Sequence, residues 1–220
     1  MTDRSASLGL RLSRIHFPIR ALGFGRRIGL WVQGCSIGCR GCMSLDTWSK
    51  DGKLTDIDTL VQEIGPWISL ADGISVTGGE PLEQAEPLAA FLKLVRPKLS
   101  GDVVLFTGYP IAGLPSGSGE VLKYVDTLIA GPFEASLPDT RPLSGSQNQT
   151  IRFMTPLGRE RYEAFSKTAA TQPGVDLVAD GDGFLLAGIP RLGDLDRLGD
   201  HLAAEGMALK TSAGRLGRRA

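Results

Sequence analysis

The 220-residue chain has very few metal-binding side chains: three cysteines and two histidines, His16 and His201. The cysteines stand within eight residues, at Cys35, Cys39 and Cys42. An odd number of cysteines cannot be closed into disulfides. Clustered, unpaired cysteines are typical of metal sites or catalysis in a reducing compartment, so we expect a cytoplasmic protein.

Net charge and long apolar runs are also absent. Lys plus Arg and Asp plus Glu both number 24, so we expect no nucleic-acid partner and no membrane-surface partner. No run of about 18 or more apolar residues is present, which argues against a membrane-spanning helix. The N-terminal stretch lacks the apolar region of a secretory signal.

Short apolar runs rich in β-branched residues alternate with helical patterns along the chain. Alternation of this kind predicts βαβ units and a parallel sheet. We therefore expect an α/β fold, an incomplete TIM-like βα barrel with parallel strands, whose cysteine loop follows the first barrel strand. The expected strands cover residues 29–32, 74–77, 103–107, 127–130 and 150–154, and the expected helices 55–70, 83–99, 120–124, 159–170 and 194–205.

Two regions are expected, with a boundary near residue 172. Residues 1–172 would form the partial barrel. Residues 173–220 would form a C-terminal extension, in which residues 175–178 and 184–187 flank a turn-rich stretch typical of a β-hairpin. A helix and a frayed basic tail would follow.

The spacing of Cys35, Cys39 and Cys42 can place three thiolates around one inorganic core and leave a further metal position open. Soft thiolate ligands select iron or zinc. The pattern alone therefore allows an iron–sulfur cluster or a structural zinc ion completed by a histidine.

A second motif, Gly78-Gly79-Glu80-Pro81, directly follows an expected buried strand. The two glycines would let the backbone come close to a ligand, and the Glu80 carboxylate could accept a hydrogen bond from an ammonium group. The same four residues also suit an ordinary strand-to-helix turn.

Together these motifs resemble those of the radical S-adenosylmethionine (radical SAM) superfamily. Within it, the chain is most similar to the activating proteins of anaerobic ribonucleotide reductase, which are glycyl-radical-enzyme activases. The resemblance runs from about residue 10 to residue 154. Further matching stretches occur in the same order, at residues 31–35, 47–48, 106–109, 125–133 and 145–149.

The resemblance implies a [4Fe–4S] cluster with three irons held by Cys35, Cys39 and Cys42. SAM would chelate the fourth iron, and the turn from Gly78 to Pro81 would contact its methionine amino group. Reductive cleavage would release a 5′-deoxyadenosyl radical, which would take a hydrogen atom from a glycine of a partner glycyl radical enzyme. A flavodoxin or ferredoxin would supply the electron.

Four further residues are expected at strand ends or loops on the same side as the cysteines and could contact SAM or the partner: Thr107, Gly108, Asp126 and Asn148. Strand-end capping and turn formation are the alternative roles for them. Two other functions stay open. One is a radical SAM enzyme that modifies a peptide or a small metabolite, and the other is a non-catalytic, zinc-stabilised interaction module.

Overall fold

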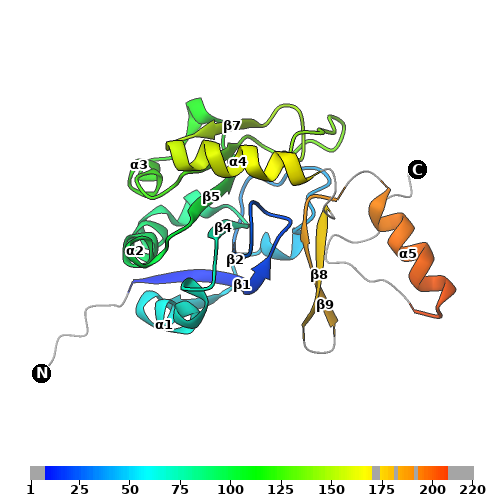
Figure 1. Ribbon diagram of the computed structural model, residues 1–220, viewed down its shortest axis with the longest axis horizontal. Helices are drawn as coiled ribbons and strands as arrows, with labels where there is room; N and C mark the ends of the chain where they lie inside the picture. Colours follow the sequence, from blue (N-terminus) through cyan, green and yellow to red (C-terminus); the bar gives the residue numbers. More distant parts are fainter. Residues whose placement is uncertain (1–7, 170–173, 181–182, 191–192, 208–220) are drawn as a thin grey trace, which may run out of the picture.

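A computed structural model describes residues 8–169, 174–180, 183–190 and 193–207 (Figure 1). The main sheet has seven strands in the order β3-β1-β2-β4-β5-β6-β7. The strands are β1 (Gly9–Ile19), β2 (Arg27–Val32), β3 (Lys53–Asp56), β4 (Gly73–Gly78), β5 (Asp102–Thr107), β6 (Thr127–Ala130) and β7 (Thr150–Phe153).

The four central strands of this sheet, β2, β4, β5 and β6, are parallel. Strands β1 and β7 run the other way: β1 pairs antiparallel with β2, and β7 pairs antiparallel with β6. The edge strand β3 pairs antiparallel with β1 and so runs in the same direction as the central strands. The expectation of a parallel strand at residues 150–154 is therefore wrong. Residues 131–149 contain no helix, so the chain has no crossover and turns back beside β6. The fold is thus α/β with a mixed sheet whose centre is parallel.

Three helices cover one face of the sheet: α1 (Ile57–Ile68), α2 (Ala85–Val95) and α3 (Ser118–Leu122) (Figure 1). Side chains alternate between the faces of a strand. In β5, Leu105 packs with these helices, whereas Val104 and Phe106 belong to clusters on the other face. The central strands are thus buried on both sides, which explains their continuous apolar runs.

The expected helices are present, with shifted boundaries. Helix α1 begins at Ile57, and the carboxylate of Asp56 accepts a hydrogen bond from the Thr59 backbone N–H at 3.1 Å. The cap is therefore Asp56, and the helix begins two residues after the expected start at residue 55. The other helices are α4 (Pro156–Ala169), α5 (Asp194–Ala204) and the 3₁₀ helices η1 (Leu45–Thr47), η2 (Pro81–Gln84), η3 (Arg96–Lys98) and η4 (Ile111–Gly113).

The opposite face of the sheet is covered by α4 and by a hairpin of β8 (Val175–Asp180) and β9 (Gly183–Gly188). The expected hairpin is confirmed. Leu185 and Ala187 of β9 pack against Trp31 and other apolar residues of the sheet. The Asp176 carboxylate accepts hydrogen bonds from the backbone N–H groups of Arg20 and Ala21, at 2.6 and 2.7 Å. The hairpin is therefore fixed to the sheet by both apolar and polar contacts.

The expected basic tail begins at residue 208 and lies outside the described residues. Within the described part of the chain, no helix combines the length and the apolar character needed to cross a membrane.

A buried ion pair joins the amino ends of the central strands. The guanidinium of Arg27 is fully buried and lies 2.7 Å from the carboxylate of Asp102. It also donates to the Ser75 hydroxyl and to the Ile74 carbonyl. The Arg27 side chain therefore connects β2, β4 and β5 at their amino ends, which lie opposite to the cysteines.

Replacing Arg27 by methionine should lower the free energy of unfolding by about 3–5 kcal/mol, because Asp102 would stay buried without a partner. Urea unfolding monitored by circular dichroism measures this. The matched control is Lys123→Met, which breaks an exposed pair with Glu120 and should cost less than about 1 kcal/mol. Equal effects of the two substitutions would contradict the structural role of the buried pair.

Candidate functional site

The cysteine loop, residues 33–52, leaves the carboxyl end of β2 and returns to β3. Its two ends are tied together by the Gln33 side chain, which donates to the carbonyls of Asp46 and Ser49 at 3.0 and 2.7 Å. The backbone N–H of Cys35 donates to the Trp48 carbonyl at 3.1 Å. The loop is thus closed at its base, and the three cysteines lie within it.

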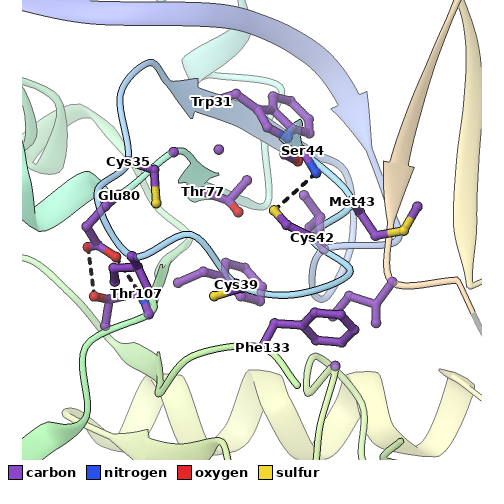
Figure 2. A pocket seen from close by; sticks show the side chains of 18 of the residues that line it. Trp31, Cys35, Cys39, Cys42, Met43, Ser44, Thr77, Glu80, Thr107 and Phe133 are labelled. Atoms are coloured by element: carbon purple, nitrogen blue, oxygen red, sulfur yellow. Dashed lines mark hydrogen bonds between the residues drawn. The ribbon is translucent and has the colours of Figure 1, made fainter. Parts of the chain in front are cut away.

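The three cysteines are unpaired and partly exposed, and their sulfur atoms face a common space (Figure 2). Burial raises the pKa of the Cys35 and Cys39 thiols. Backbone N–H groups act in the opposite direction, from Ile37 and Gly38 at Cys35 and from Phe133 at Cys39.

A backbone N–H also reaches the third sulfur atom, since Ser44 donates to Cys42 Sγ at 3.4 Å. Every cysteine sulfur therefore has an amide donor nearby. Such donors stabilise bound thiolates and tune the reduction potential of a cluster. The donor set fits an iron–sulfur cluster.

The zinc alternative requires a fourth ligand. Both histidines are described by the structure, and neither His16 nor His201 lines the cavity that the cysteines face. Within the described ranges, no three His, Cys, Asp or Glu side chains are arranged to hold a single metal ion. A histidine-completed zinc site is therefore not built around these cysteines, whereas thiolates on separate irons need not share one ion.

The turn from Gly78 to Pro81 packs directly against the start of the cysteine loop. The Gly79 N–H donates to the Val32 carbonyl and the Glu80 N–H donates to the Gly34 carbonyl, both at 2.8 Å. Gly78 has a left-handed backbone, with φ of 102°. A side chain on Gly79 would overlap the Gly34 carbonyl. The two glycines therefore allow the turn and the start of the cysteine loop to pack closely against each other.

Glu80 connects this turn to the end of β5. Its carboxylate accepts hydrogen bonds from the Thr107 hydroxyl and the Gly108 N–H, at 2.7 and 2.8 Å (Figure 2). It also accepts one from the Leu82 N–H, at 2.9 Å. The residue is only 1% exposed, and burial raises the pKa of its carboxyl group against the pull of these three donors. Glu80 thus links the carboxyl ends of β4 and β5 by hydrogen bonds.

The structure brings most of the predicted site residues together. Gly78, Gly79, Glu80, Thr107 and Gly108 line the same cavity as the three cysteines. Pro81 begins η2 directly behind the turn and is buried.

Asp126 and Asn148 do not line this cavity. Asp126 lies at the amino end of β6, where its carboxylate accepts from the Val103 N–H at 2.8 Å and the Thr155 hydroxyl at 2.6 Å. The expectation that it lies on the cysteine side is therefore wrong. Asn148 is exposed on the β6–β7 connection and donates to the Pro132 carbonyl at 2.7 Å.

The cavity also has walls that the sequence did not single out. Gln149 lines it and donates to the Gly131 carbonyl at 3.0 Å. Further walls are apolar or belong to the hairpin: Trp31, Ile37, Met43, Phe106, Phe133, Leu143 and residues 186–189. Phe133 and Gln149 fall in stretches that carry the family resemblance, whereas nothing in the sequence placed residues 186–189 here.

A sequence profile of the 4Fe-4S single cluster domain family matches residues 21–152, more than half of the chain. The chain belongs to this family. The matched region contains the cysteine loop, the Gly78–Pro81 turn and the ends of β5 and β6, so the iron–sulfur domain coincides with the site described above.

Several curated relatives of this iron–sulfur protein are named anaerobic ribonucleoside-triphosphate reductase-activating proteins. The one from Enterobacteria phage T4 is 35% identical over 137 residues, covering 59% of this chain and 85% of the relative. The one from Vibrio cholerae is 32% identical over 150 residues, covering 64% and 96%. The solved structure of QueE from Escherichia coli aligns over 92% of this chain and 94% of its own, with 15% identity and a TM-score of 0.41.

Gly79→Ala should lower the free energy of unfolding by about 1–3 kcal/mol and reduce iron loading, because the added methyl group pushes the turn away from the Gly34 carbonyl. Urea unfolding and iron analysis after anaerobic reconstitution measure the two effects. The control is Gly119→Ala in α3, where no atom lies within 4 Å of the new carbon. Iron loading and stability of Gly79→Ala equal to those of the control would contradict the role of this contact.

Proposed function

We propose that this chain is a radical SAM enzyme that generates a glycyl radical on a partner such as anaerobic ribonucleotide reductase. One observation carries the proposal: the three cysteines and the carboxyl ends of β4 and β5 line the same cavity. Each cysteine sulfur in it has a backbone N–H donor nearby. Cofactors of α/β proteins bind outside the carboxyl ends of parallel strands, which is where this cavity lies.

In this proposal Cys35, Cys39 and Cys42 hold three irons of a [4Fe–4S] cluster and leave one iron for SAM. When bound, the cluster and SAM supply the chemistry: one electron cleaves a carbon–sulfur bond, and methionine and a 5′-deoxyadenosyl radical result. The protein orients these groups and excludes water.

The chain's own residues then have distinct tasks. Gly78 and Gly79 present backbone to the cavity beside the cysteine loop. Glu80 holds Thr107 and Gly108 at the neighbouring strand end, so that the cavity wall keeps its shape as ligands enter. Asn148, on the same side of the sheet, remains a candidate partner contact.

The partner follows from the relatives' names, in which a reductase is activated. A 5′-deoxyadenosyl radical supplied at this site would take a hydrogen atom from a glycine Cα of that reductase, and 5′-deoxyadenosine and a glycyl radical would result. A flavodoxin or ferredoxin is the proposed electron donor, and the cytoplasm the proposed location. We further propose that the sheet corresponds to an incomplete TIM-like barrel formed by residues 1–172, with residues 173–220 as an extension.

Anaerobic reconstitution with iron and sulfide should produce broad absorbance near about 400 nm, as for thiolate-bound clusters. After reduction, the protein should release 5′-deoxyadenosine from SAM. Cys39→Ala should lose this activity, because one iron loses its ligand. Ser49→Ala, a change elsewhere in the same loop, should keep it.

Stoichiometric zinc without 5′-deoxyadenosine would contradict the proposal and favour an interaction module. SAM cleavage that is stimulated by a short precursor peptide or a small metabolite, and not by a reductase, would favour the alternative enzyme function.

A further inference from the structure

The hairpin β8–β9 lies beyond residue 152, where the family match ends. It nevertheless forms part of the cavity, since residues 186–189 line the same space as the three cysteines. The neighbouring strand β8 does not line this cavity. Of the two strands of the hairpin, β9 is therefore the one that borders the site, at its carboxyl end.

The register of the hairpin shows which backbone groups that edge presents. Ile189 donates its N–H to the Gly174 carbonyl at 3.0 Å, in register with the pairs Asp176↔Ala187 and Val178↔Leu185. In an antiparallel ladder, hydrogen-bonded pairs alternate with pairs whose N–H and C=O groups point outward. The outward groups on β9 are therefore those of Phe184, Leu186 and Gly188.

The two-stranded sheet contains only β8 and β9, so β9 has one edge without a neighbouring strand among the described residues. Within that part of the chain, no hydrogen bond is recorded for the outward N–H groups of Leu186 and Gly188. An unpaired strand edge is a template on which another extended segment can pair. Here the template lies within the wall of the proposed reaction cavity.

We propose that the free edge of β9 binds an extended peptide segment of the protein substrate as an added strand. This inference rests on the proposed function and names how its substrate is held. Main-chain hydrogen bonds to Leu186 and Gly188 would place the substrate backbone beside the cysteines. Pairing of this kind supplies affinity through the backbone, while side-chain pockets supply specificity.

The chemistry of the hairpin fits such an occupant. Abstraction from a glycine Cα requires the substrate backbone itself, not a side-chain tip, to approach the reacting group. An edge strand orders backbone and tolerates a residue that has no side chain. The outer face of the hairpin carries exposed Phe184 and Leu177, which are 71% and 52% exposed, so apolar side chains of an added strand would continue an apolar surface.

Hydrogen exchange resolved to single amides tests the proposal on the cluster-loaded protein. The probe is a synthetic peptide that spans the glycine-bearing C-terminal loop of the anaerobic ribonucleoside-triphosphate reductase from the same genome. Exchange of the Leu186 and Gly188 amides should slow by about tenfold or more when the peptide saturates, because both become ladder donors. The Leu177 amide, which points outward from β8, should be unchanged.

A matched pair of variants tests the same edge by affinity. Leu186→Pro removes one outward N–H that the hairpin ladder does not use. Peptide binding, measured by fluorescence anisotropy, should weaken by about tenfold or more. Leu177→Pro, the cross-strand partner of Leu186, removes the equivalent donor from the other edge and should leave binding unchanged. Slow exchange of the Ala187 amide in both variants verifies that the ladder is intact.

Three results would overturn the inference. The first is equal peptide affinity in Leu186→Pro and the unaltered protein. The second is slow hydrogen exchange of the Leu186 and Gly188 amides in the absence of peptide at every protein concentration. Such protection would mean that another part of the same chain covers this edge. The third is protection that rises with protein concentration, which would assign the edge to a second copy. Peptide binding is measured without SAM cleavage, so the edge and the proposed function can fail separately.

Discussion

The backbone contact between Gly79 and Gly34 is the constraint on which the site depends. Two adjacent parallel strands, β2 and β4, end at the same level, and the segments that follow them must lie against each other. The Glu80 N–H donates to the Gly34 carbonyl, at a separation that leaves no room for a side chain on Gly79. The position of the cysteine loop is therefore set by hydrogen bonds of the main chain.

The rest of the molecule supports that contact from two directions. Glu80 carries the connection on to β5, because its buried carboxylate binds the Thr107 hydroxyl and the Gly108 N–H. At the far edge of the sheet, the buried pair of Arg27 and Asp102 joins the amino ends of the same strands. The residues that stabilise the sheet thus lie at the amino ends of the strands, and the residues of the proposed reaction site lie at the carboxyl ends, as in other α/β proteins.

Much of this arrangement could be predicted from local sequence. The strand runs, the cysteine spacing and the turn at Gly78 are signals within a few residues. The expected strands and the turn are present, although the strand at residues 150–153 runs antiparallel to its neighbour. The prediction that Asp126 lies on the cysteine side was wrong. Its position directly before Thr127 already puts it at the amino end of β6, away from the cysteines. The place of the hairpin could not be predicted, because it depends on the packing of Leu185 and Ala187 against residues more than 150 positions earlier.

Electron paramagnetic resonance on the reductase partner tests the central claim most directly. The reduced, cluster-loaded chain is mixed with SAM and the anaerobic ribonucleoside-triphosphate reductase from the same genome under anaerobic conditions. We predict a doublet from a glycyl radical that loses its hydrogen splitting when the reductase is labelled with glycine deuterated at Cα. Consumption of SAM without any radical on the reductase would contradict the account.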